Sequence, residues 1–326
     1  MISREEVIYA YRLLFGREPE SDEVVNRYAT ELKDTRALRE MFLSAPEFQE
    51  KISGVLPPRP PRLSFSGPAM QVELDVSNEK LSALFEKVSA RWHDIGITEP
   101  YWSVLTHEGY ALKNFHLSRE AFYSGGEAEI KAFDATLHRA GVKREGLKRC
   151  LELGSGVGRV TAALARRFPE VIGADISASH LRVAEDYLRA VGCTNVVLRH
   201  LHSLDEFSAF GGFDLLYSRI VLQHNPPPVI GWLLRALLSQ LSIGGIAFVQ
   251  LPTYRAGYRF AVDDYLAQDT ASALEMHVFP QVALLDLIAD EKCRILEIRE
   301  DDSAGISATL ISNTVLLQKT TARETP

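Results

Sequence analysis

Glu152-Leu153-Gly154-Ser155-Gly156-Val157-Gly158 is the stretch of this 326-residue chain that decides its fold. The apolar run Arg149-Cys150-Leu151 precedes it, and a helix-forming stretch over 160–168 follows it. This order predicts a strand, a glycine turn and a helix. Glycines let a backbone approach a ligand closely, and the helix start offers unpaired N–H groups to an anion or a carboxylate. The acid Glu152 is out of place beside a phosphate, so the turn favours another ligand.

The spacing of the turn separates three kinds of nucleotide site. A phosphate-binding P-loop ends in Gly-Lys-Ser/Thr, whereas Gly158 is followed by Arg159 and Val160. The dinucleotide fingerprint G-x-G-x-x-G would need a third glycine where Arg159 stands. The remaining pattern, E-x-G-x-G-x-G, resembles the first motif of class I S-adenosylmethionine-dependent methyltransferases.

The segments after the turn extend this resemblance over roughly residues 120 to 320. A predicted buried strand over 171–174 ends at Asp175. The sequence separation of Gly154 and Asp175 is the one expected for a strand-helix-strand unit. Further strands are expected at 195–199, 213–218, 246–251, 294–299 and 309–318. The predicted fold class is therefore α/β: a Rossmann-like seven-stranded methyltransferase sheet with helices on both faces, plus a small all-α N-terminal domain.

The resemblance implies S-adenosylmethionine as the cofactor and S-adenosylhomocysteine as its product. Asp175 would accept hydrogen bonds from both ribose hydroxyls, and it could also cap the helix that follows. Glu152 would anchor the amino-acid end of the donor, directly or through water. His200 stands where the family often has an acid that contacts adenine, so that contact would use Leu201 and Ser203. The expected cofactor-binding residues are Glu152, Gly154, Ser155, Gly156, Gly158, Asp175, Ile176, Leu201, Ser203 and Ser218.

Two histidines are candidates for the base that would take a proton from a hydroxyl acceptor. His224 lies just beyond the strand over 213–218, where strand carboxyl ends form the ligand edge of an open α/β sheet. His277 competes with it, and a packing role is the alternative for each. No metal is expected, because the places where some O-methyltransferases carry a carboxylate trio lack acids, and His200 with His202 supplies only two ligands.

Acceptor recognition is predicted in a helical lid before the first strand and in an insert over 252–281. Aromatic faces suit sugar C–H groups, and arginines suit hydroxyls or phosphate. Buried packing is the alternative for the lid aromatics, and a solvated loop is the alternative for the insert. The expected acceptor contacts are Trp102, Tyr123, Arg219, Tyr254, Arg255 and Tyr258.

The chain divides into four predicted segments. Residues 1–54 show three helical patterns, and Ala10-Tyr11-Arg12-Leu13-Leu14-Phe15-Gly16-Arg17-Glu18-Pro19 within them resembles a bacterial helical domain of unassigned function found on enzymes of glycan and cell-surface assembly. We expect this domain to serve docking or homo-oligomerisation. A proline-rich linker over 55–70 follows, then the lid over 71–145 and the methyltransferase domain over 146–322.

Composition and charge limit the partners and the cellular location that we expect for the protein. The net charge of −7 opposes nucleic-acid binding, which needs a basic surface. No apolar run reaches about 18 residues and the start lacks a secretory pattern, so we expect no transmembrane segment and a cytoplasmic location, with peripheral attachment to a membrane-bound glycan assembly complex as a variant. The three cysteines have no metal-binding spacing, which indicates reduced structural thiols.

These observations predict an S-adenosylmethionine-dependent methyltransferase that O-methylates a sugar hydroxyl in bacterial polysaccharide or glycolipid assembly. Asn225-Pro226-Pro227-Pro228 is interpreted as a turn, because the amide- and base-methylating motif comes directly after the strand and ends in an aromatic. One alternative is methylation of a small secondary metabolite. Another is a non-catalytic scaffold with the cofactor fold, tethered to an assembly complex through residues 1–54.

Overall fold

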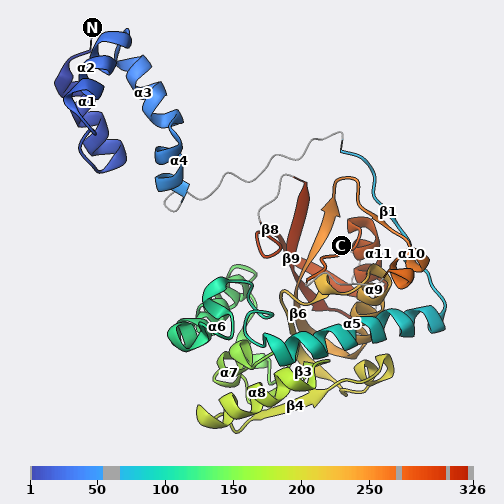
Figure 1. The fold of residues 1–326 in the computed structure, drawn as a ribbon. Coiled ribbons are helices and arrows are strands. Elements are labelled where there is room, and N and C mark those ends of the chain that lie inside the picture. Colours follow the sequence, from blue (N-terminus) through green and yellow to red (C-terminus); the bar gives the residue numbers. More distant parts are fainter. Residues whose placement is uncertain (1, 54–66, 269–273, 306–308, 322–326) are drawn as a thin grey trace. The chain divides into compact units, whose positions relative to one another are not determined.

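The computed structural model describes residues 2–53, 67–268, 274–305 and 309–321 (Figure 1). Internal contacts divide the chain into two compact units, Met1–Pro61 and Arg62–Pro326. The proline run over 56–62, predicted to be an extended spacer, lies outside the described residues. Each unit is therefore described by itself.

The N-terminal unit is helical and has its own small core. Its elements are α1 (Arg4–Ala10), the π-helical turn η1 (Tyr11–Phe15), α2 (Asp22–Glu31), α3 (Thr35–Ser44) and α4 (Pro46–Ser53). A capping box of Ser3 and Glu6 starts α1, and Gly16 ends η1 at a φ of 64°. Where the sequence predicts three helices, the structure has a fourth, α4. Pro46 follows the end of α3 and begins α4, a position that proline favours.

The C-terminal unit is built on a seven-stranded sheet in the order β4-β3-β2-β5-β6-β9-β8. The pairs among β2 to β6 are parallel, whereas β9 runs antiparallel to both β6 and β8. This mostly parallel sheet confirms the predicted fold class. The strands are β2 (Arg149–Leu153), β3 (Glu170–Asp175), β4 (Val196–His200), β5 (Phe213–Ser218), β6 (Leu241–Arg255), β8 (Cys293–Asp301) and β9 (Leu310–Lys319).

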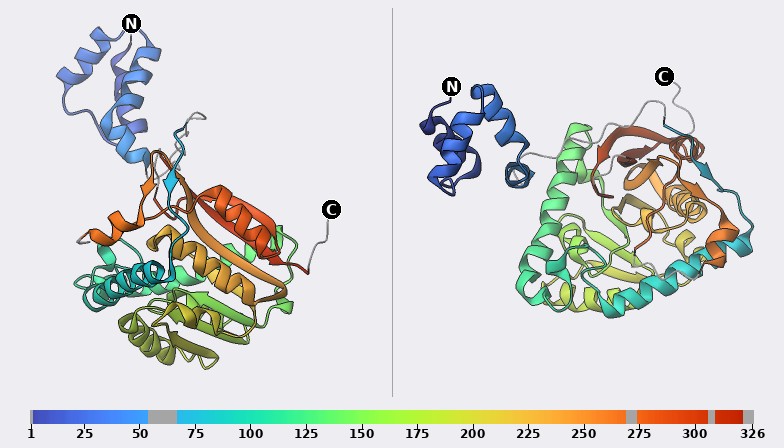
Figure 2. Two further views of the ribbon diagram at one scale, coloured as in Figure 1. Left: turned by 90° about the vertical axis from the view of Figure 1, so that its right-hand side faces the viewer. Right: turned by 45° about the horizontal axis from the view of Figure 1, so that its top comes forward.

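Helices cover both faces of this sheet, as Figures 1 and 2 show. The strand side chains alternate between two cores: Cys150 of β2 packs in one and Leu151 in the other, and Phe248 and Val249 of β6 divide in the same way. A separate two-stranded sheet pairs β1 (Gln71–Val72) with β7 (Arg259–Phe260). The helices are α5 (Asn78–Thr98), η2 (Glu108–Tyr110), α6 (Phe115–Arg139), η3 (Arg144–Gly146), α7 (Arg159–Ala165), α8 (Ala178–Ala190), η4 (Leu204–Ser208), η5 (Leu222–His224), α9 (Pro227–Gln240), α10 (Val262–Ala267) and α11 (Gln281–Asp290).

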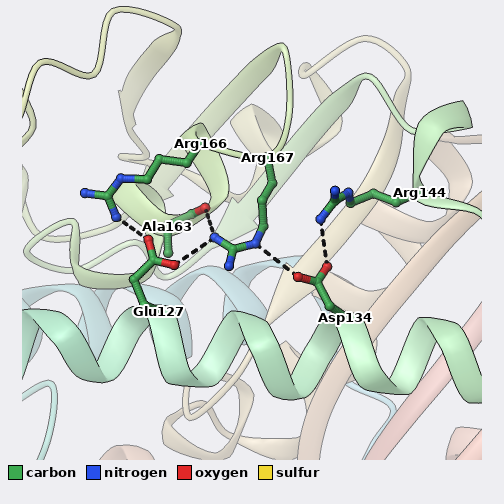
Figure 3. A network of polar contacts seen from close by, with 6 residues as sticks. All are labelled: Glu127, Asp134, Arg144, Ala163, Arg166 and Arg167. Atoms are coloured by element: carbon green, nitrogen blue, oxygen red, sulfur yellow. Dashed lines mark hydrogen bonds and ion pairs between the residues drawn. The ribbon is translucent and has the colours of Figure 1, made fainter.

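An ion network fastens the long helix α6 to α7, the helix behind the glycine turn (Figure 3). Glu127 of α6 accepts hydrogen bonds from Arg166 and Arg167. Asp134, two turns further along α6, accepts from Arg167 at 3.1 Å and from Arg144 at 3.1 Å. The network fixes the start of the sheet domain against the segment predicted to be its lid.

Within the part of the chain that the structure describes, no helix is both long enough and apolar enough to cross a membrane.

Candidate active site

The glycine turn forms as predicted and depends on its glycines. Gly154, Gly156 and Gly158 have φ angles of 76°, 51° and 81°, in the left-handed region where a Cβ atom clashes with the backbone. The N–H groups of Gly154 and Ser155 donate to the carbonyl of Ala174 at 2.8 and 3.2 Å. These bonds fasten the turn to the carboxyl end of β3.

Asp175 lies beside the turn at that same strand end. Its Oδ2 accepts from the N–H of Gly156 and its Oδ1 from the N–H of Ser177, both at 2.8 Å. The capping role belongs to Ser177, whose hydroxyl accepts from the N–H of His180 at 3.4 Å. Because a carboxylate oxygen can accept two hydrogen bonds, each oxygen of Asp175 retains a site for a ligand hydroxyl.

Glu152 lies behind the turn and is only 4% exposed. Burial raises the pKa of its carboxyl to about 8. Within the described ranges, Glu152 Oε2 and the hydroxyls of Ser155 and Ser218 are buried without a hydrogen-bond partner. Buried polar atoms normally have hydrogen-bond partners, so a group of them without partners around one turn indicates a binding site for a polar ligand.

A pocket opens at the carboxyl ends of β2, β3 and β5 and encloses about 870 Å³, including its open mouth. The carboxyl ends of the strands are where open α/β sheets bind their ligands. Phe85 and Trp92 of α5 cover it together with Ser103 and Val104, so part of the predicted lid segment does face the pocket. The remaining lining residues are Leu153, Gly154, Gly156, Arg159, Asp175, Ile176, His180, Leu201, Phe207, Arg219, Ile220, Val221, Asn225 and Leu233.

Two arginines in this lining share one buried acid. Glu129 of α6 forms ion pairs with Arg159 at 2.6 Å and with Arg219 at 3.0 Å, and it accepts a hydrogen bond from the Tyr217 hydroxyl at 2.8 Å. Burial by itself acts to raise the pKa of Glu129, but the two guanidiniums outweigh it and hold that pKa below its ordinary value. One carboxylate therefore faces two cations at the pocket wall.

Only some of the predicted cofactor residues line the pocket directly. Gly154, Gly156, Asp175, Ile176 and Leu201 do so. The others stand elsewhere: Glu152, Ser155 and Ser218 are buried, Gly158 begins α7 against Ala184, and Ser203 is exposed at the start of η4.

The two candidate bases are neighbours, but they are not pocket-lining residues. His224 Nδ1 donates to the carbonyl of Glu275 at 2.8 Å, which leaves Nε2 as the acceptor nitrogen of the neutral ring. Burial lowers the pKa of His224 to about 4. The ring stands 5.2 Å from that of the pocket residue Trp92. His277 Nδ1 is 2.9 Å from the hydroxyl of Tyr258.

The predicted acceptor residues are divided among several places. Arg219 lines the pocket, whereas Tyr123 is buried and stacks on Tyr187 of α8 at 3.6 Å. Trp92, ten positions before the predicted Trp102, is the tryptophan in the lining. Tyr254 and Arg255 are the last two residues of strand β6 and do not lie in a loop, because β6 continues beyond its predicted end at Leu251.

A second hollow, here called the outer groove, contains Tyr258, Arg255 and His277. Glu275 lies in the same groove with its Oε2 3.5 Å from His277 Nε2, and this contact is the first of the causes that lower the Glu275 pKa to about 2. The other lining residues are Gln71, Arg259, Phe260, Ala261, Asp264, Tyr265, Gln268 and Met276.

His200 and His202 are in edge contact at 3.9 Å between ring centres, and His200 Nε2 donates to the carbonyl of Ile176 at 3.1 Å. Among the residues described, there is no group of three or more His, Cys, Asp or Glu side chains that could hold a metal ion.

Comparison with known proteins matches residues 150–245 to the family described as "Methyltransferase domain". The chain is 38% identical over 104 residues to the trans-aconitate 2-methyltransferase of Deinococcus radiodurans, a match that covers 31% of this chain and 37% of that protein. It is 29% identical over 128 residues to the protein-L-isoaspartate O-methyltransferase of Picosynechococcus sp., covering 39% of this chain and 51% of that protein. The chain thus spans about half or less of the length of these curated relatives.

Among solved structures, the magnesium protoporphyrin IX methyltransferase of Synechocystis PCC 6803 shares the fold. With S-adenosylhomocysteine bound, its TM-score is 0.50 at 14% identity, over 72% of this chain and 99% of that one. The form with S-adenosylmethionine bound gives 0.50 at 15% identity, over 75% and 100%. Residues 150–245 thus match a methyltransferase domain, and the sheet unit shares the fold of a methyltransferase solved with S-adenosylhomocysteine or S-adenosylmethionine bound.

The site fits that cofactor. Asp175 would receive the ribose, Leu201 and Ile176 would flank the adenine, and the buried polar atoms around Glu152 would take the amino-acid end. The bound cofactor supplies an electrophilic methyl group. The protein residues have to hold it, exclude water and align an acceptor.

Proposed function

We propose that the protein is an S-adenosylmethionine-dependent methyltransferase that O-methylates a sugar hydroxyl of a bacterial polysaccharide or glycolipid precursor. The observation that carries the methyl-transfer part is the pocket at the strand ends, which the glycine turn, Asp175 and the lid helix α5 line together.

The outer groove supports the sugar acceptor. The ring of Tyr258 offers a flat face beside Arg255 and Arg259, and Asp264 and Glu275 can accept hydrogen bonds from hydroxyls. Flat apolar faces bordered by charged hydrogen-bonding groups match the alternating C–H and O–H surface of a sugar ring. The groove residue His277 is tied to the loop after β5, which also carries the pocket residues Val221 and Asn225: its N–H donates to the carbonyl of Gln223 at 2.7 Å.

His224 is the better placed of the two candidate bases in this proposal. Its Nε2, the acceptor nitrogen of a ring that is neutral at neutral pH, receives a long hydrogen bond of 3.4 Å from the Gln223 amide, and Asn225, its neighbour in sequence, lines the pocket. The Nδ1 of His277 is already engaged by Tyr258. In the transfer assay below, His224→Ala should lower turnover by about 100-fold, the lower end of a general base's contribution, and leave cofactor affinity unchanged. His138→Ala, an exposed histidine on α6, is the matched control; equal rates for both variants would remove His224 as the base.

A small carboxylate acceptor is the second candidate. The pocket wall carries Arg159 and Arg219 with Glu129 between them, and paired guanidiniums suit a carboxylate. One curated relative is named for trans-aconitate, a carboxylate.

One assay separates the candidates. The full chain is first titrated with S-adenosylmethionine by calorimetry, and then incubated with methyl-labelled cofactor and either sugar-nucleotide precursors or small carboxylic acids. A labelled sugar ether survives mild base, whereas a labelled methyl ester is hydrolysed. A base-stable sugar product supports the first proposal, and a base-labile product supports the second. Cofactor binding without transfer to either class would leave the scaffold alternative, and no binding would reject methyl transfer altogether.

A further inference from the structure

Ile220 has an unusual backbone at the edge of the pocket. Its φ is 60°, and its side chain lines the pocket just after β5. A β-branched residue is a genuine outlier in the left-handed region, because its Cβ substituents collide with the backbone, so its surroundings have to enforce the conformation. Among the described residues, the other non-glycine with a positive φ is Lys292, between α11 and β8, at 53°.

Gln250 of β6 supplies the enforcing contact. The N–H of Ile220 donates to Gln250 Oε1 at 2.8 Å, and Gln250 is fully buried. Its Nε2 donates to Gln223 Oε1 at 3.0 Å and to the Ser312 hydroxyl at 2.7 Å. The Ser312 hydroxyl proton is directed to Asp301 at 2.9 Å, so its oxygen has to accept from Gln250. The amide of Gln250 therefore has one orientation, with Oε1 towards Ile220.

The left-handed turn at Ile220 brings Val221 onto the glycine turn. A Cβ atom added to Gly154 would lie 2.2 Å from Val221 Cγ2, so the methyl groups of Val221 fill the space that a side chain at Gly154 would need. Both Gly154 and Val221 line the pocket. The loop after β5 and the cofactor turn after β2 thus interlock, and the conformation of Ile220 sets their register.

Resting on the proposed methyl transfer, we propose that Gln250 is a positioning residue of the active site: it holds Ile220 in the left-handed conformation and so keeps the pocket wall formed before the cofactor binds. Gln250 reaches no ligand itself, since it is buried and absent from the residues that line the pocket. A purely structural role would instead make cofactor affinity follow stability.

The test uses glycine substitutions in the full chain, with S-adenosylhomocysteine as the calorimetric ligand. Ile220→Gly and Lys292→Gly each relieve a strained positive φ, so each should keep or raise the unfolding temperature, by about 2–4 °C where the relief outweighs the added entropy of the unfolded chain. Only Ile220→Gly should weaken binding, by about tenfold, because the ligand has to order the freed loop and a lining side chain is lost; Gln250→Met, which keeps every lining side chain, tests the ordering alone. A variant that is as stable as the parent and binds less tightly separates positioning from stability.

Gln250→Met gives an independent arm, because it removes the acceptor for the Ile220 N–H without changing a lining side chain. It should weaken binding by about tenfold, and the double variant Gln250→Met/Ile220→Gly should bind like either single variant within about twofold, since both act on one loop. If the parent protein binds S-adenosylhomocysteine and both single variants bind it equally well, the role of Gln250 is rejected while the proposed function stands. If the parent does not bind the ligand, the proposed function itself fails.

Discussion

At the scale of single residues, Gly154 meets two requirements, one of backbone and one of space. Its φ of 76° disfavours any side chain, and Val221 occupies the position that a Cβ atom would take. Gly192, after α8, has a nearly equal φ of 74° but nothing within 4 Å of an added Cβ. The two glycines separate backbone strain from steric overlap.

We expect Gly192→Ala to lower the free energy of unfolding by about 1–2 kcal/mol, the cost of a left-handed alanine, and to leave cofactor affinity unchanged. Gly154→Ala should cost about 1–3 kcal/mol more, because Val221 has to move, and it should reduce cofactor affinity at least tenfold. Urea denaturation and calorimetric titration measure the two effects. If both variants lose the same stability and bind the cofactor as the parent does, Val221 can move aside without affecting the pocket, which would contradict this prediction.

Glu152 makes stability depend on pH in a direction opposite to that of an ordinary surface acid. Its pKa is about 8 in the folded protein, against an ordinary value of 4.5. Between these values the unfolded chain releases the proton and the folded chain retains it, so the stability contributed by this group falls as pH rises, by at most about 1.4 kcal/mol per pH unit. Glu152→Gln should flatten the decline from pH 5 to 8, leaving the variant more stable than the parent at pH 8 but a weaker cofactor binder. An unchanged pH slope in denaturation experiments would contradict the burial argument.

The sequence predicts the glycine turn and Asp175 because both are local consequences of a strand followed by a turn. Glu129 is not predictable in this way, since it reaches Arg159 from a helix that begins well before β2. The lid tryptophan presents the same difficulty. Trp92 and Trp102 are both aromatic, and only the packing of α5 over the sheet brings Trp92 into the pocket.

At the scale of elements, the contact between α6 and α7 depends on the close approach of one helix to the start of the other. A Cβ atom added to Gly126 of α6 would lie 2.2 Å from the carbonyl oxygen of Arg159, whereas one added to Gly125 would meet Arg159 Nη1 at an ordinary 3.5 Å. These adjacent glycines share a helix and differ mainly in what they face.

Gly125→Ala should leave stability unchanged or raise it by up to about 1 kcal/mol, because alanine is the better helix former. Gly126→Ala should lower it by about 1–3 kcal/mol, because α6 has to move away from α7, which stretches the Arg159–Glu129 ion pair between them. Thermal unfolding of the two variants side by side measures the difference. Similar unfolding temperatures would mean that α6 is not tightly packed at this point.

The extent of β6 shows why the sequence gives element boundaries less well than element order. Its apolar run ends at Leu251 and Pro252 follows, which predicts a strand end there. In the structure Pro252 pairs with Ser312 of β9, and a register shift between Pro252 and Tyr254 lets pairing continue to Arg255. The partner strand lies about 60 positions away along the chain, so no local pattern reveals the extension.

At the scale of the whole molecule, each unit holds its own core. The N-terminal core is formed by residues between Ile2 and Phe48, and the cores of the sheet unit begin at residue 72. The pocket lining runs from Phe85 to Leu233, entirely within the second unit. Residues 1–54 are therefore not required to bind the cofactor, which is compatible with the docking role proposed for them.

We accordingly expect residues 62–326, expressed alone, to fold and to bind S-adenosylmethionine within about twofold of the full chain. All residues that line the pocket belong to the sheet unit, so the free energy of cofactor binding should not change when the N-terminal unit is removed. Residues 1–61 alone should be marginally stable, because a domain of about 60 residues buries a small fraction of its surface. Calorimetric titration of the truncated and full chains, with their unfolding temperatures, makes the comparison. A loss of affinity above tenfold in a folded truncated chain would place the N-terminal unit at the site, whereas intact affinity combined with lost transfer to a glycan acceptor would assign it to acceptor delivery.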